Sequence, residues 1–144
     1  MNNNKNLFDR SKHETAPFCK KVEKPWGYEI IYTPENAPAV GKILHVRAGK
    51  RLSLQYHDEK IETLCLIEGR ALITVSDHLE KIKEVEMERN KGYFMQPGQI
   101  HRVTAISDIT FIESSTPETG NTIRLEDDTN RQTETEEMRI KNRK

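Results

Sequence analysis

The sequence predicts an all-β domain that closes into a sandwich or barrel, and two observations support this fold class. Between residues 27 and 115 the apolar residues come in short runs rich in Ile, Leu, Val and Tyr, and turn residues separate the runs. The same region has no helix-length stripe of apolar residues with a 3.6-residue period. Many short strands favour a closed structure, because an open sheet would leave long exposed edges.

The predicted strands follow these apolar runs. They cover residues 27–33, 41–47, 51–57, 62–67, 71–76, 81–87, 92–95, 101–106 and 110–115. Glu68-Gly69 predicts a short hairpin connection, and Pro97-Gly98 predicts a tight turn.

The length of 144 residues is typical of one domain. Polar residues are concentrated at the two ends of the chain, which have almost no aliphatic periodicity and cannot offset their ordering entropy by burial. We therefore expect a domain over residues 22–131, with a flexible N-terminal tail over 1–21 and a flexible charged C-terminal tail over 132–144.

Charge and hydropathy exclude several classes of partner. Lys plus Arg and Asp plus Glu both number 23, so no general field attracts nucleic acid or a membrane surface, although specific anions stay possible. The chain has no run of 18 apolar residues, and its first residues lack the apolar stretch of a secretion signal. We expect a cytoplasmic protein.

Residues 51–57 (RLSLQYH) alternate strictly between polar and apolar side chains. Arg51, Ser53, Gln55 and His57 share one face of the predicted strand, and Leu52, Leu54 and Tyr56 share the other. Either the polar face is solvated and the Leu face is core, or the polar face lines a barrel lumen. In the second case the Leu face needs another cover, and a second subunit would supply it, so we expect a homodimer.

Four side chains with metal-binding atoms, on strands predicted to lie close together, predict a metal site. Gln55 and His57 project from one strand at an i, i+2 spacing, and Glu62 lies across a turn on the adjoining strand. His101, from a distant hairpin, completes the set. His13 and His78, by contrast, are interpreted as ordinary surface histidines. His45 stays ambiguous.

This donor set predicts one divalent ion without identifying it. Two imidazoles, a carboxylate and a carboxamide oxygen suit Zn, Mn, Fe(II), Co or Ni, and no thiolate selects zinc. Because one carboxylate offsets only one of the two charges, the ion should act as a strong Lewis acid.

These spacings resemble the two motifs of the cupin superfamily, whose first motif reads G-x5-H-x-H-x3–4-E-x6-G. Gln55 replaces the first His, and the sequence Ser53-Leu54-Gln55-Tyr56-His57 is similar to the S-L-Q-x-H of the type II mannose-6-phosphate isomerase domain. The resemblance covers about residues 22–131 and extends to three further segments: Gly98 to Arg102, Lys24 to Glu29 and Arg124 to Asp128. Departures at Asn90, Gln96 and Asn130 affect turns and not ligands.

The resemblance implies a double-stranded β-helix, or jelly-roll, barrel and a metal-dependent sugar-phosphate isomerase. Aldose–ketose isomerisation moves a proton between adjacent carbons through an enediolate, so it needs a base near the metal. Glu62 itself and Glu113 are the candidates, and the sequence does not settle whether Glu113 faces inward.

A phosphorylated substrate requires cations near the barrel mouth. Arg124, Arg102 and Arg51 flank strands that carry ligands or match the ends of the family, so we expect them to bind substrate. For Lys42 and Lys50 a solubilising surface role is the better interpretation.

Three classes of function are compatible with the sequence. The first is the sugar-phosphate isomerase or epimerase, the second a non-catalytic metal-containing sugar-binding module, and the third an Fe(II) cupin dioxygenase. Fold alone selects none of them. A carboxamide in place of an imidazole argues against the dioxygenase, because it is a weaker donor for an oxygen-activating iron.

Overall fold

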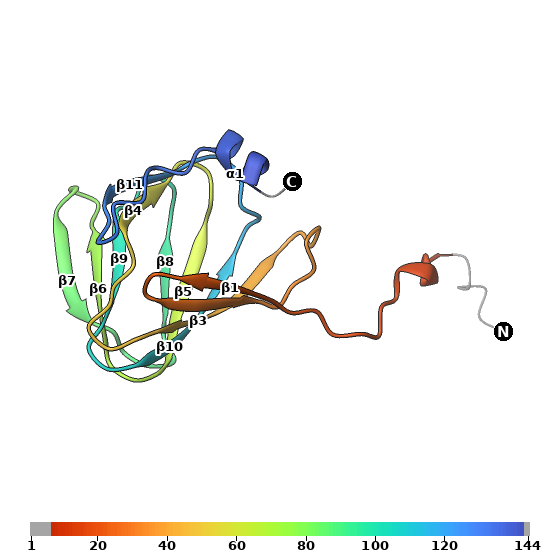
Figure 1. The fold of residues 1–144 in the computed structure, drawn as a ribbon, viewed down its shortest axis with the longest axis horizontal. Helices are drawn as coiled ribbons and strands as arrows, with labels where there is room; N and C mark the ends of the chain where they lie inside the picture. The colour runs from red at the N-terminus through yellow and green to blue at the C-terminus, as the bar shows by residue number, and fades with distance from the viewer. Residues whose placement is uncertain (1–6, 143–144) are drawn as a thin grey trace.

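The computed structural model describes residues 7–142 of the chain. Within this part the chain is almost entirely β-structure, as the sequence predicts (Figure 1). A short 3-10 helix, η2 (Arg10–Lys12), precedes the strands and a short helix, α1 (Glu136–Asn142), follows them. The strands are β1 (Lys20–Lys24), β2 (Gly27–Ile31), β3 (Val40–Val46), β4 (Leu54–His57), β5 (Glu62–Glu68), β6 (Ala71–Ser76), β7 (Ile82–Glu86), β8 (Gly92–Met95), β9 (His101–Ala105), β10 (Ile109–Ser115) and β11 (Thr122–Glu126).

The strands form two antiparallel sheets that enclose the core. The six-stranded sheet has the order β1-β2-β3-β10-β5-β8, and the five-stranded sheet has the order β11-β4-β9-β6-β7. Neighbours in each sheet come from distant parts of the sequence: β3 pairs with β10, and β4 pairs with both β9 and β11. This pairing brings the two hairpins that carry the predicted ligands to the same end of the molecule.

Two strands, β1 and β11, were not predicted: β1 has almost no apolar alternation, whereas β11 (TIRLE) does alternate but is short and lies in a polar part of the sequence. β1 (KKVEK) has a single apolar residue, and its backbone pairs only with β2. Conversely, the predicted strand 51–57 is regular only from Leu54, and Arg51 joins the sheet through an isolated bridge to Thr104.

Inward-facing side chains change from apolar to polar at one end of the barrel. Along β10 the inward positions are Ile109, Phe111 and Glu113, all of them buried. The same order recurs in β3 (Val46, Leu44, Lys42), in β5 (Leu66, Leu64, Glu62) and in β9 (Ala105, Val103, His101). The barrel therefore has an apolar core at one end and a polar cavity of about 360 Å³ at the other.

The polar side of residues 51–57 faces this cavity from Ser53 onward, since Ser53, Gln55 and His57 line it. The apolar side is not the free surface that the sequence suggested. Leu52 packs against the core, and both Leu54 and Tyr56 are half-buried. These side chains are therefore partly covered within one chain, and the expected homodimer stays a prediction.

The expected tails also differ from the structure. β1 begins at Lys20, inside the predicted N-terminal tail. After residue 131 the chain packs on the barrel instead of leaving it: the backbones of Thr122 and Glu134 exchange hydrogen bonds of 2.8 and 2.9 Å, and Arg139 of α1 is 5% exposed. Residues 1–6 and 143–144 of the predicted tails lie outside the described part.

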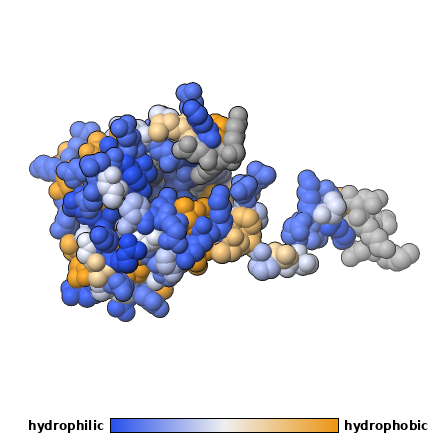
Figure 2. Space-filling view, viewed as in Figure 1, coloured by the Kyte–Doolittle hydropathy of each residue, from blue (hydrophilic) through white to orange (hydrophobic). Residues whose placement is uncertain are grey.

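Residues 7–19 form an extended arm that projects away from the barrel (Figures 1 and 2). Leu7 and Phe8 on this arm are 69% and 63% exposed. Across the described residues, no helix is long and apolar enough to span a bilayer.

Candidate metal centre

Two imidazoles and one carboxylate meet at the polar end of the barrel. His57 is the last residue of β4, Glu62 the first of β5 and His101 the first of β9. Nε2 of His101 lies 2.7 Å from Oε1 of Glu62, and Nε2 of His57 lies 3.4 Å from the same oxygen. All three side chains are buried. The structure thus brings together three of the four ligands predicted from sequence.

Hydrogen bonds on the far side of each ring orient the two imidazoles. Nδ1 of His101 lies 2.9 Å from the carbonyl oxygen of Gln99, which can only accept. Nδ1 of His101 therefore carries a proton, and Nε2 is the ring atom that would bind a metal ion. Nδ1 of His57 lies 3.0 Å from the hydroxyl of Thr122, which accommodates the same tautomer. Among residues 7–142 neither Nε2 has a hydrogen-bond partner.

This arrangement fits one divalent ion. The three candidate ligand atoms lie within 4.8 Å of one another, and no other group of three His, Cys, Asp or Glu in the described chain does so. Ligands bonded at about 2.1 Å lie about 3.0–3.4 Å apart, so the pair at 3.4 Å fits directly and the pair at 2.7 Å must open slightly. Without thiolates, the donor set suits several transition metals.

Gln55, the fourth predicted ligand, lies beside this cluster. It lines the cavity, and its backbone is paired with His101 of β9 on one side and Arg124 of β11 on the other. Its Oε1 accepts a hydrogen bond of 2.6 Å from the hydroxyl of Ser53. Since a carbonyl oxygen has two lone pairs, Oε1 keeps one for a metal ion, and Ser53 fixes its direction.

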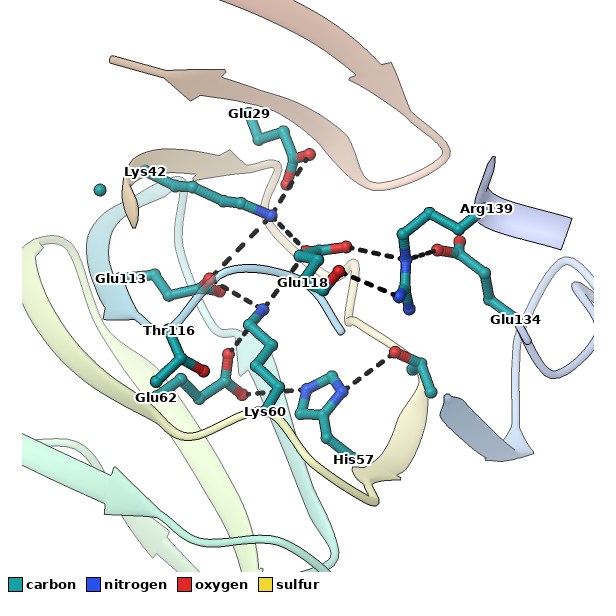
Figure 3. A network of polar contacts seen from close by, with 12 residues as sticks. Glu29, Lys42, His57, Lys60, Glu62, Glu113, Thr116, Glu118, Glu134 and Arg139 are labelled. Atoms are coloured by element: carbon teal, nitrogen blue, oxygen red, sulfur yellow. Dashed lines mark hydrogen bonds and ion pairs between the residues drawn. The ribbon is translucent and has the colours of Figure 1, made fainter. Parts of the chain in front are cut away.

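A second buried carboxylate faces the cluster through a lysine (Figure 3). Nζ of Lys60 lies 3.2 Å from Oε2 of Glu62 and 2.9 Å from Oε2 of Glu113. The structure thereby answers what the sequence left open, because Glu113 faces inward. Burial raises the pKa of Glu113. Burial also acts to raise the pKa of Glu62, but Lys60 and the two imidazoles hold it well below its usual range.

Because Glu62 contacts His101, a proton and a metal ion compete for Nε2 of His101. Burial acts to lower the pKa of His101, but its contact with Glu62 outweighs this and raises it. A metal ion at Nε2 displaces that proton, so metal affinity should fall as the pH is lowered.

The ion network continues from the cavity to the C-terminal helix. Lys42 is 6% exposed, and its Nζ lies 2.7 Å from Oε1 of Glu118 and 4.0 Å from Glu113. Oε2 of Glu118 lies 3.3 Å from Nε of Arg139. The interpretation of Lys42 as a surface charge was wrong, because three carboxylates from separate segments, Glu29, Glu113 and Glu118, surround its ammonium group.

The three arginines predicted to bind substrate occupy different positions. Arg124 and Arg102 line the cavity, whereas Arg51 does not. Arg51 is exposed, and its guanidinium forms a bidentate ion pair with Asp128 outside the cavity. Arg102 is buried, with Nε donating to the carbonyl of Leu52. The structure therefore does not place Arg51 with the other predicted site residues.

Sequence reasoning missed Lys60, Glu118 and Arg139. Lys60 carried a usable signal, since it stands two residues before Glu62 and so shares its side of the chain. Glu118 follows the last predicted strand in a polar loop, and Arg139 lies in a segment without apolar periodicity. Neither has a local pattern that distinguishes it from a surface charge.

Comparison with protein families gives a match over residues 10–133 to the family described as mannose-6-phosphate isomerase C-terminal. The comparison with curated proteins returned no match. Among solved structures, oxalate decarboxylase from Bacillus subtilis has a TM-score of 0.63 at 19% identity, over 78% of this chain and 33% of that one. The capsular polysaccharide assembling protein CapF from Staphylococcus aureus has a TM-score of 0.60 at 14% identity, over 81% and 34%.

The two antiparallel sheets, the polar end of the barrel and these structural matches define a cupin with a jelly-roll barrel. At this level of identity the solved structures support the fold alone, and the chain spans about a third of their length. The family match covers most of the chain. The protein belongs to the mannose-6-phosphate isomerase C-terminal family of cupins.

Proposed function

We propose that the protein is a metal-dependent isomerase of a phosphorylated sugar, similar to mannose-6-phosphate isomerase, which interconverts an aldose and a ketose. The observation that carries the proposal is a buried His57/Glu62/His101 cluster with a second buried carboxylate, Glu113, held next to it by Lys60. The cluster can hold the ion. Because Glu113 is not one of the three clustered ligands, it can move a proton while Glu62 stays with the ion.

Division of labour between the two carboxylates supports this assignment. Oε1 of Glu62 faces both imidazoles, so a metal ion held by the cluster would occupy this carboxylate. Glu113 lies outside the cluster of ligand atoms, and its carboxylate is paired with Lys60, whose Nζ lies 2.9 Å from Oε2. Glu113 is therefore the better candidate for the base.

The proposed reaction moves one proton between two carbons. Glu113 removes the proton from C2 of the aldose and returns it to C1, while the hydroxyl proton on O2 passes to O1. A bound divalent ion would stabilise the negative charge that develops on these two oxygens. Lys60 keeps Glu113 oriented toward the substrate and balances its charge when it is ionised.

The charge of the cavity favours an anionic substrate. The whole chain carries equal numbers of acidic and basic residues. The cavity lining, however, has an excess of cations, with the basic residues Lys20, Lys24, Lys42, Lys60, Arg102, Arg124, Arg131 and Arg139 against the acidic residues Glu29, Glu62, Glu113, Glu118 and Glu134. A phosphate group would compensate this local excess.

Arg124 is the best candidate for the phosphate contact. Its Nε is buried and has no hydrogen-bond partner among residues 7–142. Its NH1 donates a hydrogen bond of 2.7 Å to the carbonyl oxygen of Gln132. The side chain is thus anchored at one nitrogen and keeps another donor for a ligand.

Proton exchange tests the proposal directly. The metal-loaded protein is incubated with mannose 6-phosphate or fructose 6-phosphate in deuterated water, and NMR follows deuterium at C1 and C2. We expect deuterium in the recovered sugar and its loss in Glu113→Gln. Saturable binding without exchange for any sugar phosphate would instead favour the sugar-binding module, and oxygen consumption with Fe(II) would favour a dioxygenase.

A further inference from the structure

Glu118 lies among three buried cations that come from separate parts of the chain (Figure 3). Its Oε1 lies 2.7 Å from Nζ of Lys42 on β3 and 3.4 Å from Nζ of Lys60 in the loop between β4 and β5. Its Oε2 lies 3.3 Å from Nε of Arg139 on α1. The three cationic side chains are at most 7% exposed, yet all of them line the cavity. A ligand in the cavity can therefore reach the position that Glu118 fills.

This position strongly stabilises negative charge. Burial acts to raise the pKa of Glu118, but Lys42, Lys60 and Arg139 hold this pKa far below its usual range. The carboxylate is therefore ionised at neutral pH. The same three cations would stabilise another anion at this position for the same reason.

A carboxylate does not satisfy the three cations equally. Two ammonium groups share Oε1 of Glu118, and Arg139 lies closer to Glu134, at 2.6 Å, than to Glu118. A phosphate group carries about 1.5 to 2 negative charges at pH 7 and has three strong acceptor oxygens. It can offer each of the three cations an oxygen of its own, so it suits this position better than the carboxylate does.

The loop between β10 and β11, which carries Glu118, is fixed at its two ends. The backbone N of Thr116 donates to the carbonyl of Ile61 at 3.0 Å, and its hydroxyl accepts from the backbone N of Ile61 at 3.1 Å. Asn121 donates two hydrogen bonds of 2.7 Å to the carboxylate of Asp58. The side chain of Glu118 lies between these anchors and is 20% exposed. It can therefore turn toward solvent while both anchors stay intact.

We propose that these three cations form a binding site for a phosphate group, which Glu118 fills until a ligand displaces its carboxylate. The exchange replaces one anion by another, so no cation is left buried alone. Arg139 keeps its place during the exchange, because Glu134 and the carbonyl of Gly120 also hold it. The phosphate group belongs either to a sugar phosphate or to free inorganic phosphate, since both present the same tetrahedral group.

This site is distinct from the position of Arg124. Glu134 stands between the two, with one carboxylate oxygen 2.6 Å from Nε of Arg139 and the other 4.0 Å from NH2 of Arg124. The cavity therefore has two positions for an anion, and a variant of each can show which one a sugar phosphate uses. Only this sugar-phosphate comparison rests on the proposed function.

Isothermal titration calorimetry of the metal-loaded full chain with inorganic phosphate tests the site. We expect Glu118→Gln to bind phosphate about tenfold more tightly than the wild type, as when an internal group that fills a site about nine-tenths of the time is removed. Lys42→Met should weaken binding about tenfold or more, because a charged donor is lost. Glu59→Gln is the matched control. Glu59 is exposed on the loop that carries Lys60 and forms no ion pair with the three cations in the described part of the chain, so its variant should bind like the wild type.

Circular dichroism establishes that each variant is folded, and Glu118→Ala is a second variant that should act like Glu118→Gln. Unchanged or weaker phosphate binding in both Glu118 variants would overturn the proposal, since a purely structural role for Glu118 predicts no gain in affinity. An equal gain in Glu59→Gln would also overturn it, because the gain would then reflect general charge. Absence of phosphate binding in the wild type and in both Glu118 variants would do the same.

Competition separates the two sources of the phosphate group. If a sugar phosphate uses the site, Glu118→Gln should also tighten the binding of mannose 6-phosphate, and inorganic phosphate should compete with it. If the site takes free phosphate, the two ligands should bind together, and Arg124→Gln should weaken the sugar phosphate alone. Deuterium exchange tests the proposed function separately: exchange without any effect of Glu118 on phosphate binding would refute this site and leave the isomerase, and tighter phosphate binding without exchange would do the reverse.

Discussion

Removal of the guanidinium of Arg139 should destabilise the barrel, although Arg139 lies outside the residues that match the family. Nε of Arg139 lies 2.6 Å from Oε1 of Glu134, and NH1 donates a hydrogen bond of 2.9 Å to the carbonyl oxygen of Gly120. Contacts with Glu118 add a carboxylate oxygen at 3.3 Å and a carbonyl oxygen at 3.4 Å. One side chain thus ties α1 to the loop between β10 and β11.

The expected cost follows from what each contact loses. Breaking a buried ion pair by removing one member costs about 3–5 kcal/mol when the other charge is left alone. Here Glu118 keeps Lys42 at 2.7 Å, and the side chain of Glu134 is 31% exposed, so both carboxylates stay partly compensated. The buried carbonyl of Gly120 loses its charged donor. We therefore expect Arg139→Met to lower the free energy of unfolding by about 2–3 kcal/mol.

Urea denaturation at pH 7 measures this free energy, and a thermal melt should show a midpoint lowered by about 4–12 °C for a chain of this size. Methionine is as good a helix former as arginine, so the change does not act through helix propensity. Lys141→Ala, at an exposed position of the same helix, is the control and should cost less than about 0.5 kcal/mol. Equal stabilities of Arg139→Met and Lys141→Ala would refute the role of Arg139 as a clamp.

Four further changes probe the site and the core. His101→Ala should abolish stoichiometric metal binding, measured by calorimetry, because Nε2 is one of three clustered ligand atoms; retained binding would contradict the site. Glu113→Gln should keep metal binding but lower the rate of deuterium exchange into sugar phosphate by about 10²–10⁴-fold, and an unchanged rate would exclude Glu113 as the base. Phe111→Ala should cost about 3–5 kcal/mol in urea denaturation because Phe111 is 0% exposed, whereas a cost below 1 kcal/mol would mean that the core collapses around the cavity. Burial acts to raise the pKa of Glu118, but Lys42 and Lys60 hold this pKa far below its usual range. The ion pairs of Glu118 therefore contribute to stability above pH ~4.3, the pKa of an unfolded glutamate, and this contribution is lost as the pH falls below that value. The wild type should therefore be more stable than Glu118→Gln at pH 7, and denaturation curves should show this gap narrowing toward pH 3; a constant gap would contradict the ion pairing.

The sequence by itself indicated the fold class and the candidate ligands of the first motif, whereas His101 was added through the resemblance to the second cupin motif. Both depend on local spacing: alternation fixes the side of a strand on which a residue lies, and the i, i+2 relation of Gln55 and His57 therefore aims both into the barrel. The same rule places Glu62 inward from the start of β5. Such relations span a few residues and do not depend on how the rest of the chain folds.

Only the tertiary structure decided which charges join the site. Lys42 and Lys60 resemble surface lysines in sequence, and each is buried because carboxylates from distant segments converge on its ammonium group. Arg51 resembles a cavity residue by alternation, but the regular strand begins only at Leu54, and Arg51 pairs outside with Asp128.

The same distinction applies to the surfaces and the chain ends. The sequence indicated an apolar face at Leu52, Leu54 and Tyr56, whereas in the structure Leu52 packs against the core and the other two side chains are half-buried. Residues 132–142, which have no periodic pattern, are held on the barrel by a buried arginine. Burial of a charge depends on partners far away in the sequence, and no local pattern encodes the distance between two strands that are separated by fifty residues or more.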